Sequence, residues 1–443
     1  MSLARRNSGE LAPHLRHWAE RIEHVARAVK LDFFPLDFQL LDAADVNGIA
    51  AYGGFPVRYP SWRFGMEFER LDKSYTWGLS KIYELVINND PVVAYLVRSN
   101  SDSEQKLVMA HVCGHADFFK HNCWFAATDR HMLDTMATHA TKIRRSTDRF
   151  GLETVERFLD LALSVENLLD PYLPLRAHLR RTREPDPDLP RVTRTAAPTY
   201  DIVGFLVENA PLEAWQREIL ALVRAEAYYF QPQRMTRIMN EGWASFWHSR
   251  ILTGGVLDAS EIVDFADCHS GATLQSPGRV NPYKLGIELW RYAEERGEDI
   301  FRLRRIHNDA SLLDELIDEG FVAREQLFVF GRNTRSGKNE VQDRDWRKVK
   351  TRLLADLAWG GLPQIELVEV DSDRELVLAH HHDGRDLQLA KAADTLVRLE
   401  ALWKAPVRLE TLEDGQPKRL RCERGEVRVE ELAKPADKPA QPS

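Results

Sequence analysis

Two histidines, His111 and His115, lie four residues apart in the segment Met109–Asn122. If this segment is helical, both imidazoles leave the same face of the helix, one turn apart. Two imidazoles so placed can bind one metal ion, as in the H-E-x-x-H helix of zinc hydrolases. The residue after the first histidine is Val112, so the glutamate that acts as general base in that motif is missing. The spacing predicts metal binding but does not identify the general base.

A second segment, Met239–His248, offers a carboxylate with helical spacing. Glu241 is followed by Gly-Trp-Ala, and His248 lies seven residues later on the same helical face. A catalytic zinc ion takes three protein ligands and keeps a fourth position open for water. We therefore predict that His111, His115 and Glu241 bind Zn²⁺. The alternative is a helix with a buried aromatic stripe, whose Glu241 and His248 satisfy each other.

Because position 112 is not glutamate, another group must take the proton of the attacking water. The sequence offers His248, His269 and, off the stripe of His111, Asp117. A Ser-His-Asp site is a poor alternative, because the chain has no G-x-S-x-G turn and Ser245 lies within a predicted helix. The chain also has no G-x-x-x-x-G-K-[ST] phosphate loop.

Three further residues could bind a substrate. Asn122 lies on the same helical stripe as His111, whereas Arg279 and Asn281 lie in a loop that contains proline and glycine. Arginine and asparagine on such a loop would suit a substrate carboxylate. The alternative is that Asn281 caps the helix that follows it. The run 380–382 is three histidines, but it follows a predicted strand, so we expect a surface feature.

The elements that must position these residues are mainly helices. Apolar residues recur at helical spacing in most of the chain before residue 358. Near residue 360 short β-favouring runs appear, around one further helix. We expect a mainly α fold with a zincin-like helical core and a small C-terminal α+β module. The predicted helices span residues 11–30, 62–149 with breaks, 211–230, 235–251, 285–296 and 387–403, and the predicted strands span 365–370, 375–380, 407–411 and 418–422.

The chain has 443 residues, enough for a large core and two or more domains. We predict a helical core over 1–358, the α+β module over 359–431 and a disordered tail over 432–443. Within the core, residues 176–198 are basic and broken by prolines, which predicts a flexible surface insert.

Composition limits the classes of function. A formal net charge of −8 argues against binding to nucleic acid or to a membrane surface. No apolar run approaches the roughly 18 residues that span a bilayer, and we find no export signal. The four cysteines show no C-x-x-C spacing, as expected for reduced thiols. We expect a cytoplasmic protein.

Several stretches of the chain resemble the stage V sporulation protein R (SpoVR) family, and the resemblance covers most of residues 30–410. The matching stretches are Tyr52-Gly-Gly-Phe-Pro, Trp77-Gly-Leu-Ser-Lys-Ile-Tyr-Glu-Leu-Val-Ile-Asn88, Ala110-His-Val-Cys-Gly-His-Ala-Asp-Phe-Phe-Lys-His-Asn122, Glu226-Ala-Tyr-Tyr-Phe, Ile238-Met-Asn-Glu-Gly-Trp-Ala-Ser-Phe-Trp-His248 and Leu274-Gln-Ser-Pro-Gly-Arg-Val-Asn-Pro-Tyr-Lys-Leu-Gly286. Valine after the first histidine is usual in that family.

The resemblance implies a bacterial cytoplasmic protein linked to formation of the spore cortex, or to stress responses in bacteria that do not sporulate. It also implies a partner, a serine protein kinase of the PrkA type. Together with the predicted zinc site, it suggests a hydrolase that acts on an amide bond in a peptide or muropeptide. The rival expectation is a non-enzymatic regulatory or scaffold protein that works with the kinase. An open cleft around the ligands would favour the enzyme, and a sealed interior would favour the scaffold.

Overall fold

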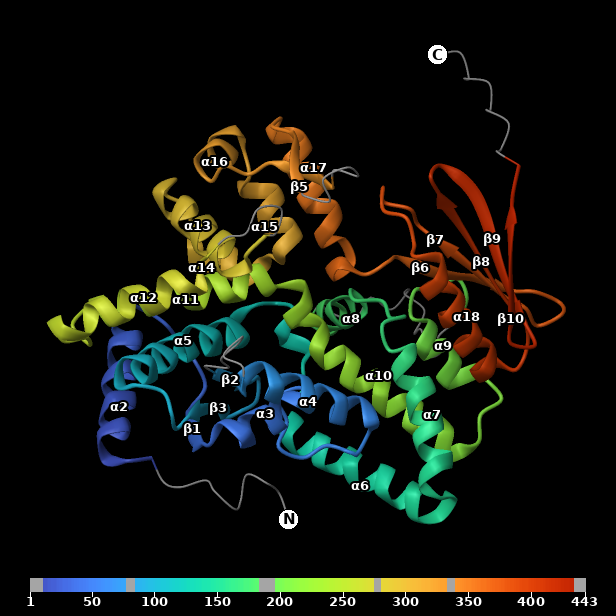
Figure 1. Cartoon of the computed structure of the whole chain (residues 1–443), viewed down its shortest axis with the longest axis horizontal. Coiled ribbons are helices and arrows are strands. Elements are labelled where there is room, and N and C mark those ends of the chain that lie inside the picture. The colour runs from blue at the N-terminus through green and yellow to red at the C-terminus, as the bar shows by residue number, and fades with distance from the viewer. Residues whose placement is uncertain (1–10, 77–83, 183–195, 275–279, 333–338, 434–443) are drawn as a thin grey trace. The chain divides into compact units, whose positions relative to one another are not determined.

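The computed structural model of the chain describes residues 11–76, 84–182, 196–274, 280–332 and 339–433 (Figure 1). The chain forms two compact units, one made of residues 1–145 and 232–357 and the other of residues 146–231 and 358–443. The chain thus passes between units three times, whereas the sequence predicted one boundary, at residue 358. Every candidate site residue named above belongs to the first unit.

The first unit is mostly helical. Its elements are α2 (Pro13–Ala28), β1 (Leu36–Leu41), α3 (Ala43–Ala51), α4 (Trp62–Thr76), β2 (Glu84–Ile87), β3 (Val92–Val97), α5 (Asp102–His121), η1 (Phe125–Ala127), most of α6 (Met132–Phe150), α11 (Arg237–Thr253), η2 (Ala259–Glu261), α12 (Ile262–Ala272), α13 (Pro282–Glu295), α14 (Ile300–Ile306), α15 (Asp309–Leu316), α16 (Glu319–Arg324), β4 (Val329–Arg332), β5 (Asn339–Asp343) and α17 (Trp346–Leu357).

Helix α5, which carries the histidine pair, is buried on nearly all sides. It begins with a capping box, in which Ser101 accepts from the backbone of Glu104 and Glu104 accepts from the backbone of Ser101. Residues 108–119 in its middle are buried around the whole circumference, as expected for a helix in the centre of a core. His111, His115 and Asp117 are the buried polar side chains among them.

Helix α11 packs against α5 and α13 at unusually close range. A Cβ atom on Gly114 of α5 would lie 2.6 Å from the Cα of Ala244. A Cβ atom on Gly286 of α13 would likewise lie 2.6 Å from the Cα of Gly242. Real Cβ atoms do not approach backbone so closely, so these crossings require glycine. They bring Glu241 on α11 next to the histidines of α5.

The N-terminus of α11 is capped by a residue from another helix. Thr236 at the N-cap position makes no side-chain cap, and the carboxylate of Asp309 accepts from the backbone N–H groups of Ile238 and Met239, each at 2.8 Å. This carboxylate satisfies donors that a helix start leaves free. Burial raises the pKa of Asp309 to about 7.

The prediction of a helical pattern from residue 62 to 149 is wrong for residues 84–97. Strands β2 and β3 occupy this range, and β3 pairs in parallel with β1 and antiparallel with β2. All six residues of β3 are buried. A strand covered on both faces shows no polar alternation, so its periodicity does not separate it from a buried helix.

The second unit contains helices and the C-terminal α+β module. Its helices in the first segment are α7 (Leu152–Ser164), α8 (Leu173–Thr182), α9 (Ile202–Asn209) and most of α10 (Ala214–Met235), and its second segment comprises η3 (Ala358–Gly361), β6 (Ile365–Val370), β7 (Leu376–His380), α18 (Leu389–Trp403), β8 (Val407–Glu413), β9 (Gln416–Glu423) and β10 (Glu426–Glu431). The prediction of a mainly α fold with a small C-terminal α+β module is confirmed. Strand β10 was not predicted.

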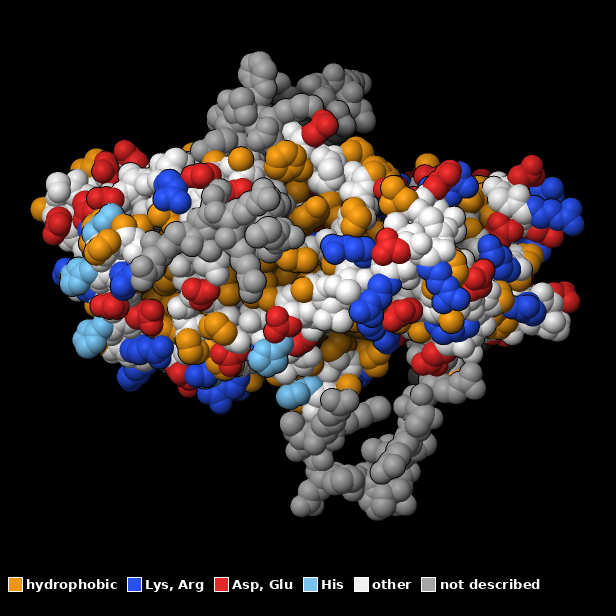
Figure 2. Space-filling view, turned by 90° about the horizontal axis from the view of Figure 1, so that it is seen from below, with side chains coloured by type: hydrophobic (Ala, Val, Ile, Leu, Met, Phe, Trp, Pro, Cys, Tyr) orange, Lys and Arg blue, Asp and Glu red, His pale blue; other side chains and the backbone are white. Residues whose placement is uncertain are grey.

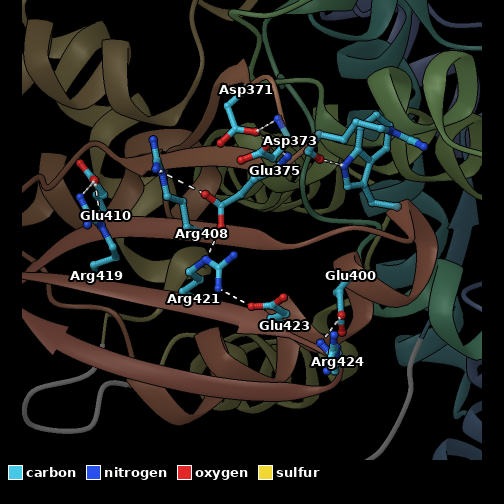
Figure 3. A network of polar contacts seen from close by, with 12 residues as sticks. Asp371, Asp373, Glu375, Glu400, Arg408, Glu410, Arg419, Arg421, Glu423 and Arg424 are labelled. Carbon is cyan, nitrogen blue, oxygen red and sulfur yellow. Dashed lines mark hydrogen bonds and ion pairs between the residues drawn. The ribbon is translucent and has the colours of Figure 1, made fainter.

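The five strands of this module form one sheet in the order β10-β9-β8-β7-β6. One face is apolar and lies against α18, with Leu378 and Leu409 paired across β7 and β8. The other face carries ion pairs, drawn in Figure 3, in which Glu375 lies between Arg408 at 3.4 Å and Arg421 at 2.5 Å. The side chains of this charged face thus pair with one another.

The basic insert predicted over 176–198 begins as a helix, because residues 176–182 belong to α8. Residues 183–195 and the last ten residues lie outside the described part of the chain. Among the described helices, none combines the length and the apolar character needed to cross a membrane. On the face drawn in Figure 2, acidic and basic side chains are interspersed over the described residues.

Candidate metal centre

The structure brings His111, His115 and Glu241 together, as the spacing predicts. The Nε2 atoms of His111 and His115 lie 3.7 and 3.5 Å from Oε2 of Glu241. One ligand atom from each residue lies within 4.8 Å of the other two. Among the described residues, this is the cluster of histidine, cysteine and acidic side chains with the spacing of a metal site.

These distances suit ligands around one cation better than a hydrogen-bonded cluster. Hydrogen bonds to oxygen are shorter, about 2.7–3.2 Å between heavy atoms. Ligands about 2.0–2.2 Å from a tetrahedral zinc ion lie roughly 3.3–3.5 Å apart. Oε2 of Glu241 is buried and accepts no hydrogen bond from the described residues. A buried carboxylate oxygen facing two imidazole nitrogens is a donor set that fits a divalent metal ion.

The ring of His115 is oriented by Asn240, the neighbour of Glu241 in sequence. The Nδ1 atom of His115 lies 2.9 Å from Oδ1 of Asn240. Since a carbonyl oxygen only accepts, Nδ1 carries the proton and donates it. The lone pair of His115 is then on Nε2, which faces Glu241. Hydrogen bonds of this kind fix the tautomer of metal-binding histidines.

The ring of His111 is backed by a chain of two more histidines. Its Nδ1 lies 2.8 Å from Nδ1 of His248, and Nε2 of His248 lies 3.0 Å from Nδ1 of His269. If Nε2 of His111 is to present a lone pair, its Nδ1 must donate to His248, and His248 must donate through Nε2 to His269. The chain of three rings therefore has one consistent set of proton positions in which His111 can bind a metal.

Burial keeps most of this cluster uncharged apart from the carboxylate. It lowers the pKa of His111 to about 4 and that of His248 well below its ordinary value. The pKa of His269 is lowered as well, mainly by burial. Burial alone would raise the pKa of Glu241, but His111, His115 and the hydroxyl of Tyr283 outweigh it and lower the pKa. Neutral imidazoles and an ionised carboxylate are the protonation states that bind metals.

Tyr283, at the start of α13, completes the side of the cluster nearest Glu241. Its hydroxyl donates to the carboxylate of Glu241, and its ring centroid lies 6.3 Å from that of His111. A phenol hydroxyl beside a metal ligand can orient that ligand or donate to a bound substrate. We had not singled out this residue from the sequence.

The candidates for the general base do not lie on the side of the cluster where Glu241 faces the histidines. His248 and His269 are on the Nδ1 side of His111, whereas Glu241 faces its Nε2. Asp117 is fully buried and its carboxylate accepts from Arg304 at 2.7 Å, from the indole of Trp243 and from the backbone of Asp32, both at 2.9 Å. The three donors fix this carboxylate in the core, where burial raises the pKa of Asp117 although Arg304 and the other two donors lower it.

The candidates for substrate binding have structural contacts. Asn122 is buried and donates to the backbone oxygens of Arg304 and His307 at 2.7 and 2.9 Å. Asn281 caps α13, accepting from the backbone of Tyr283 at 2.9 Å. Arg279 lies outside the described residues. The capping alternative for Asn281 therefore describes what its side chain does.

Asn240 and Tyr283 are the functional candidates that sequence reasoning missed. Each lies within two residues of a position that we had singled out, Glu241 and Asn281 respectively. No periodicity marks either residue, because their roles depend on contacts between helices far apart in the chain. Proximity to a predicted ligand on the same helix was the one signal available for Asn240.

Comparison with known proteins identifies the family. The model of the family described as SpoVR like protein matches residues 10–189 and 176–362, and that of the SpoVR-like C-terminal domain matches residues 363–414. The chain is 29% identical to the Escherichia coli K12 protein named uncharacterized protein YcgB, over 90% of this chain and 92% of the relative. No solved structure matches. The two family models together cover nearly the whole chain, which therefore belongs to the SpoVR family.

Proposed function

We propose that this protein is a metal-dependent hydrolase that cleaves an amide bond, with His111, His115 and Glu241 as ligands of a zinc ion. The observation that carries the proposal is the spacing of the two Nε2 atoms and Oε2 of Glu241, at 3.7 and 3.5 Å. A zinc ion held there would polarise a carbonyl group and lower the pKa of a bound water towards about 7. The two facing helices α5 and α11 that supply the ligands agree with a zincin-like core.

The residues around the cluster would have separate tasks. Asn240 and His248 hold the two imidazoles with their Nε2 lone pairs towards Glu241. The proton acceptor has to lie on the Glu241 side of His111, since His248 and His269 are behind the ring. Glu241 lies on that side and would accept the proton through its carboxylate. Tyr283 would donate to the substrate or to the carboxylate as the reaction proceeds.

The substrate class in this proposal comes from the family. A link between SpoVR proteins and the spore cortex points to a peptide or muropeptide substrate. Hydrolysis of its peptide amides would use the polarised carbonyl and the activated water that such a site provides. Cytoplasmic precursors or recycled muropeptides would be accessible to a cytoplasmic enzyme. A serine protein kinase of the PrkA type would be its partner in regulation.

A second candidate is a structural metal site in a regulatory or scaffold protein. His111 and His115 are only 3% and 5% exposed, and the side chain of Glu241 is 15% exposed. Such burial is expected of a closed structural site more than of an open catalytic one. The completely buried Val112 in place of the usual base favours the same candidate.

One experiment separates the candidates. The purified full chain is incubated with defined muropeptides, with and without chelator, and the products are identified by mass spectrometry. The enzyme predicts cleavage that stops with chelator and in Glu241→Gln, but continues in His121→Gln, a histidine of the same helix outside the cluster. A structural metal instead predicts no cleavage, and a chelated protein that unfolds at a lower temperature.

A further inference from the structure

A cavity of about 590 Å³ lies in the C-terminal module, within the second unit and apart from the metal centre. Its floor is the apolar face of the sheet, with Ile365 from β6, Leu378 from β7 and Leu409 from β8. Its volume falls in the range of about 300–1,000 Å³ that small-molecule sites occupy. The ion-paired face of the same sheet, shown in Figure 3, lies on the opposite side.

The cavity exists because one half of α18 carries small side chains. The residues of α18 that line it are Lys391, Ala392, Thr395, Leu396 and Leu399, which share one helical face. Near the C-terminal end of the helix, the large side chains of Leu402 and Trp403 are buried and do not line the cavity. Near its N-terminal end, the short side chains of Ala392 and Thr395 line it.

The walls are apolar and the rim is charged. Leu168, Leu362 and Leu387 add to the apolar surface, and the charged groups lie in the loop that leads into α18 and in its first turn. An apolar wall with a few polar groups at one end is the common form of a ligand site. It accepts a ligand with an apolar body and one polar head.

The rim charges define that head. Asp383 is ion-paired with Arg385, and Oδ1 of Asp386 accepts a hydrogen bond from Nε2 of His382 at 2.7 Å. The ammonium of Lys391 makes no ion pair or hydrogen bond with the residues that the structure describes. Since both carboxylates are engaged, the available charged donor at the rim is this ammonium. The start of α18, which no side chain caps, adds partial positive charge at the same end.

His380 also lines the cavity without adding charge. Its Nδ1 lies 2.9 Å from Oγ1 of Thr411, and burial lowers its pKa. The interior is therefore neutral and the rim offers one cation, which matches a ligand that carries a single negative charge.

From these observations we infer that the C-terminal module binds a small amphipathic carboxylate, whose apolar body fills the cavity and whose carboxylate pairs with Lys391. Other occupants give different results in a binding experiment. An uncharged apolar ligand would not depend on Lys391, and a cationic ligand would be favoured by its removal.

The test uses the full chain and three matched probes, octanoate, octanol and octylammonium, in isothermal titration calorimetry. We expect saturable binding of one octanoate, at least tenfold weaker binding of octanol and no binding of octylammonium. Lys391→Met should lower the octanoate affinity about tenfold, to that of octanol. Ala392→Leu, which fills the cavity, should abolish binding.

Ala393→Leu is the matched control, because Ala393 lies on the same helix and does not line the cavity. It should bind octanoate like the wild type, and thermal unfolding of each variant checks that it is folded. Equal affinity for all three probes, non-saturable binding, or unchanged binding in Ala392→Leu would overturn the inference. A folded Lys391→Met variant that binds octanoate as well as the wild type would overturn the role of the ammonium.

Discussion

At the scale of single residues, the proposed metal centre depends on which nitrogen of each histidine carries the proton. Hydrogen bonds at Nδ1 determine the position of this proton, through Asn240 for His115 and through His248 for His111. Ligand residues without such support rotate and lose affinity. Asn240 and His248 should therefore affect metal affinity almost as much as the proposed ligands do.

Substitution of Asn240 tests this dependence. Asn240→Ala removes the acceptor for Nδ1–H of His115 and should weaken zinc binding about 10- to 100-fold. Asn240→Asp keeps an acceptor at the same place and should bind zinc within a few-fold of the wild type. Competition with a chromophoric chelator measures both affinities. Equal affinity in Asn240→Ala and wild type would contradict the proposed role.

Asp309 predicts a pH dependence of stability. Its pKa is raised by burial to about 7 in the folded chain, against about 3.9 when unfolded. The folded state therefore holds this proton more tightly, so this group's contribution to stability is greatest below about pH 4 and falls until about pH 7. Asp309→Asn cannot titrate and keeps one acceptor for the start of α11.

The measurement is urea unfolding of the metal-free protein at pH 5 and pH 8. Relative to the wild type, Asp309→Asn should gain on the order of 2 kcal/mol of stability between these two values. A difference between variant and wild type that does not change with pH would show that Asp309 titrates normally.

At the scale of elements, the helices that carry the proposed ligands were predicted from the sequence. Helices α5 and α11 were expected from apolar spacing, and Glu241 was expected opposite the histidine pair. Strands β2 and β3 were missed, since the unbroken apolar run Val92–Val97 has no period. The close crossings of α11 were also not predicted, because a glycine within a helical sequence does not indicate which other helix packs against it.

The crossing of α11 and α13 gives a prediction about stability. A methyl group at Gly242 would collide with the backbone of Gly286, so Gly242→Ala should destabilise the fold by more than about 2 kcal/mol. At Gly271 of α12 nothing lies within 4 Å of an added Cβ, and alanine there should be neutral or stabilising by up to about 1 kcal/mol. Chemical unfolding of both variants is the measurement. Similar stability of Gly242→Ala and Gly271→Ala would mean that the helices separate at little cost.

At the scale of the whole molecule, the sequence indicated a helical chain with a distinct C-terminal module, but not the division into two units of two segments each. Local patterns report periodicity and turns, and they do not report which distant segments share a core. The same limit applies to the site. The three proposed ligands were found by residue type and spacing, whereas Tyr283 reaches Glu241 from α13 through packing alone.

The metal centre and the cavity of the C-terminal module belong to different units. Variants of one should therefore leave the binding properties of the other unchanged, and Glu241→Gln serves as a control for octanoate binding. The two proposals can therefore be tested separately. A negative result for one does not contradict the other.

The central claim is that two imidazoles and one carboxylate bind a single metal ion. Elemental analysis of the purified full chain after incubation with zinc and removal of the excess tests it directly. We expect about one zinc ion per chain in the wild type and in His121→Gln, and less than about a tenth of that in His115→Ala and Glu241→Gln, since two remaining ligands hold zinc poorly. Negligible zinc in the wild type, or the same zinc content in all four proteins, would contradict the account.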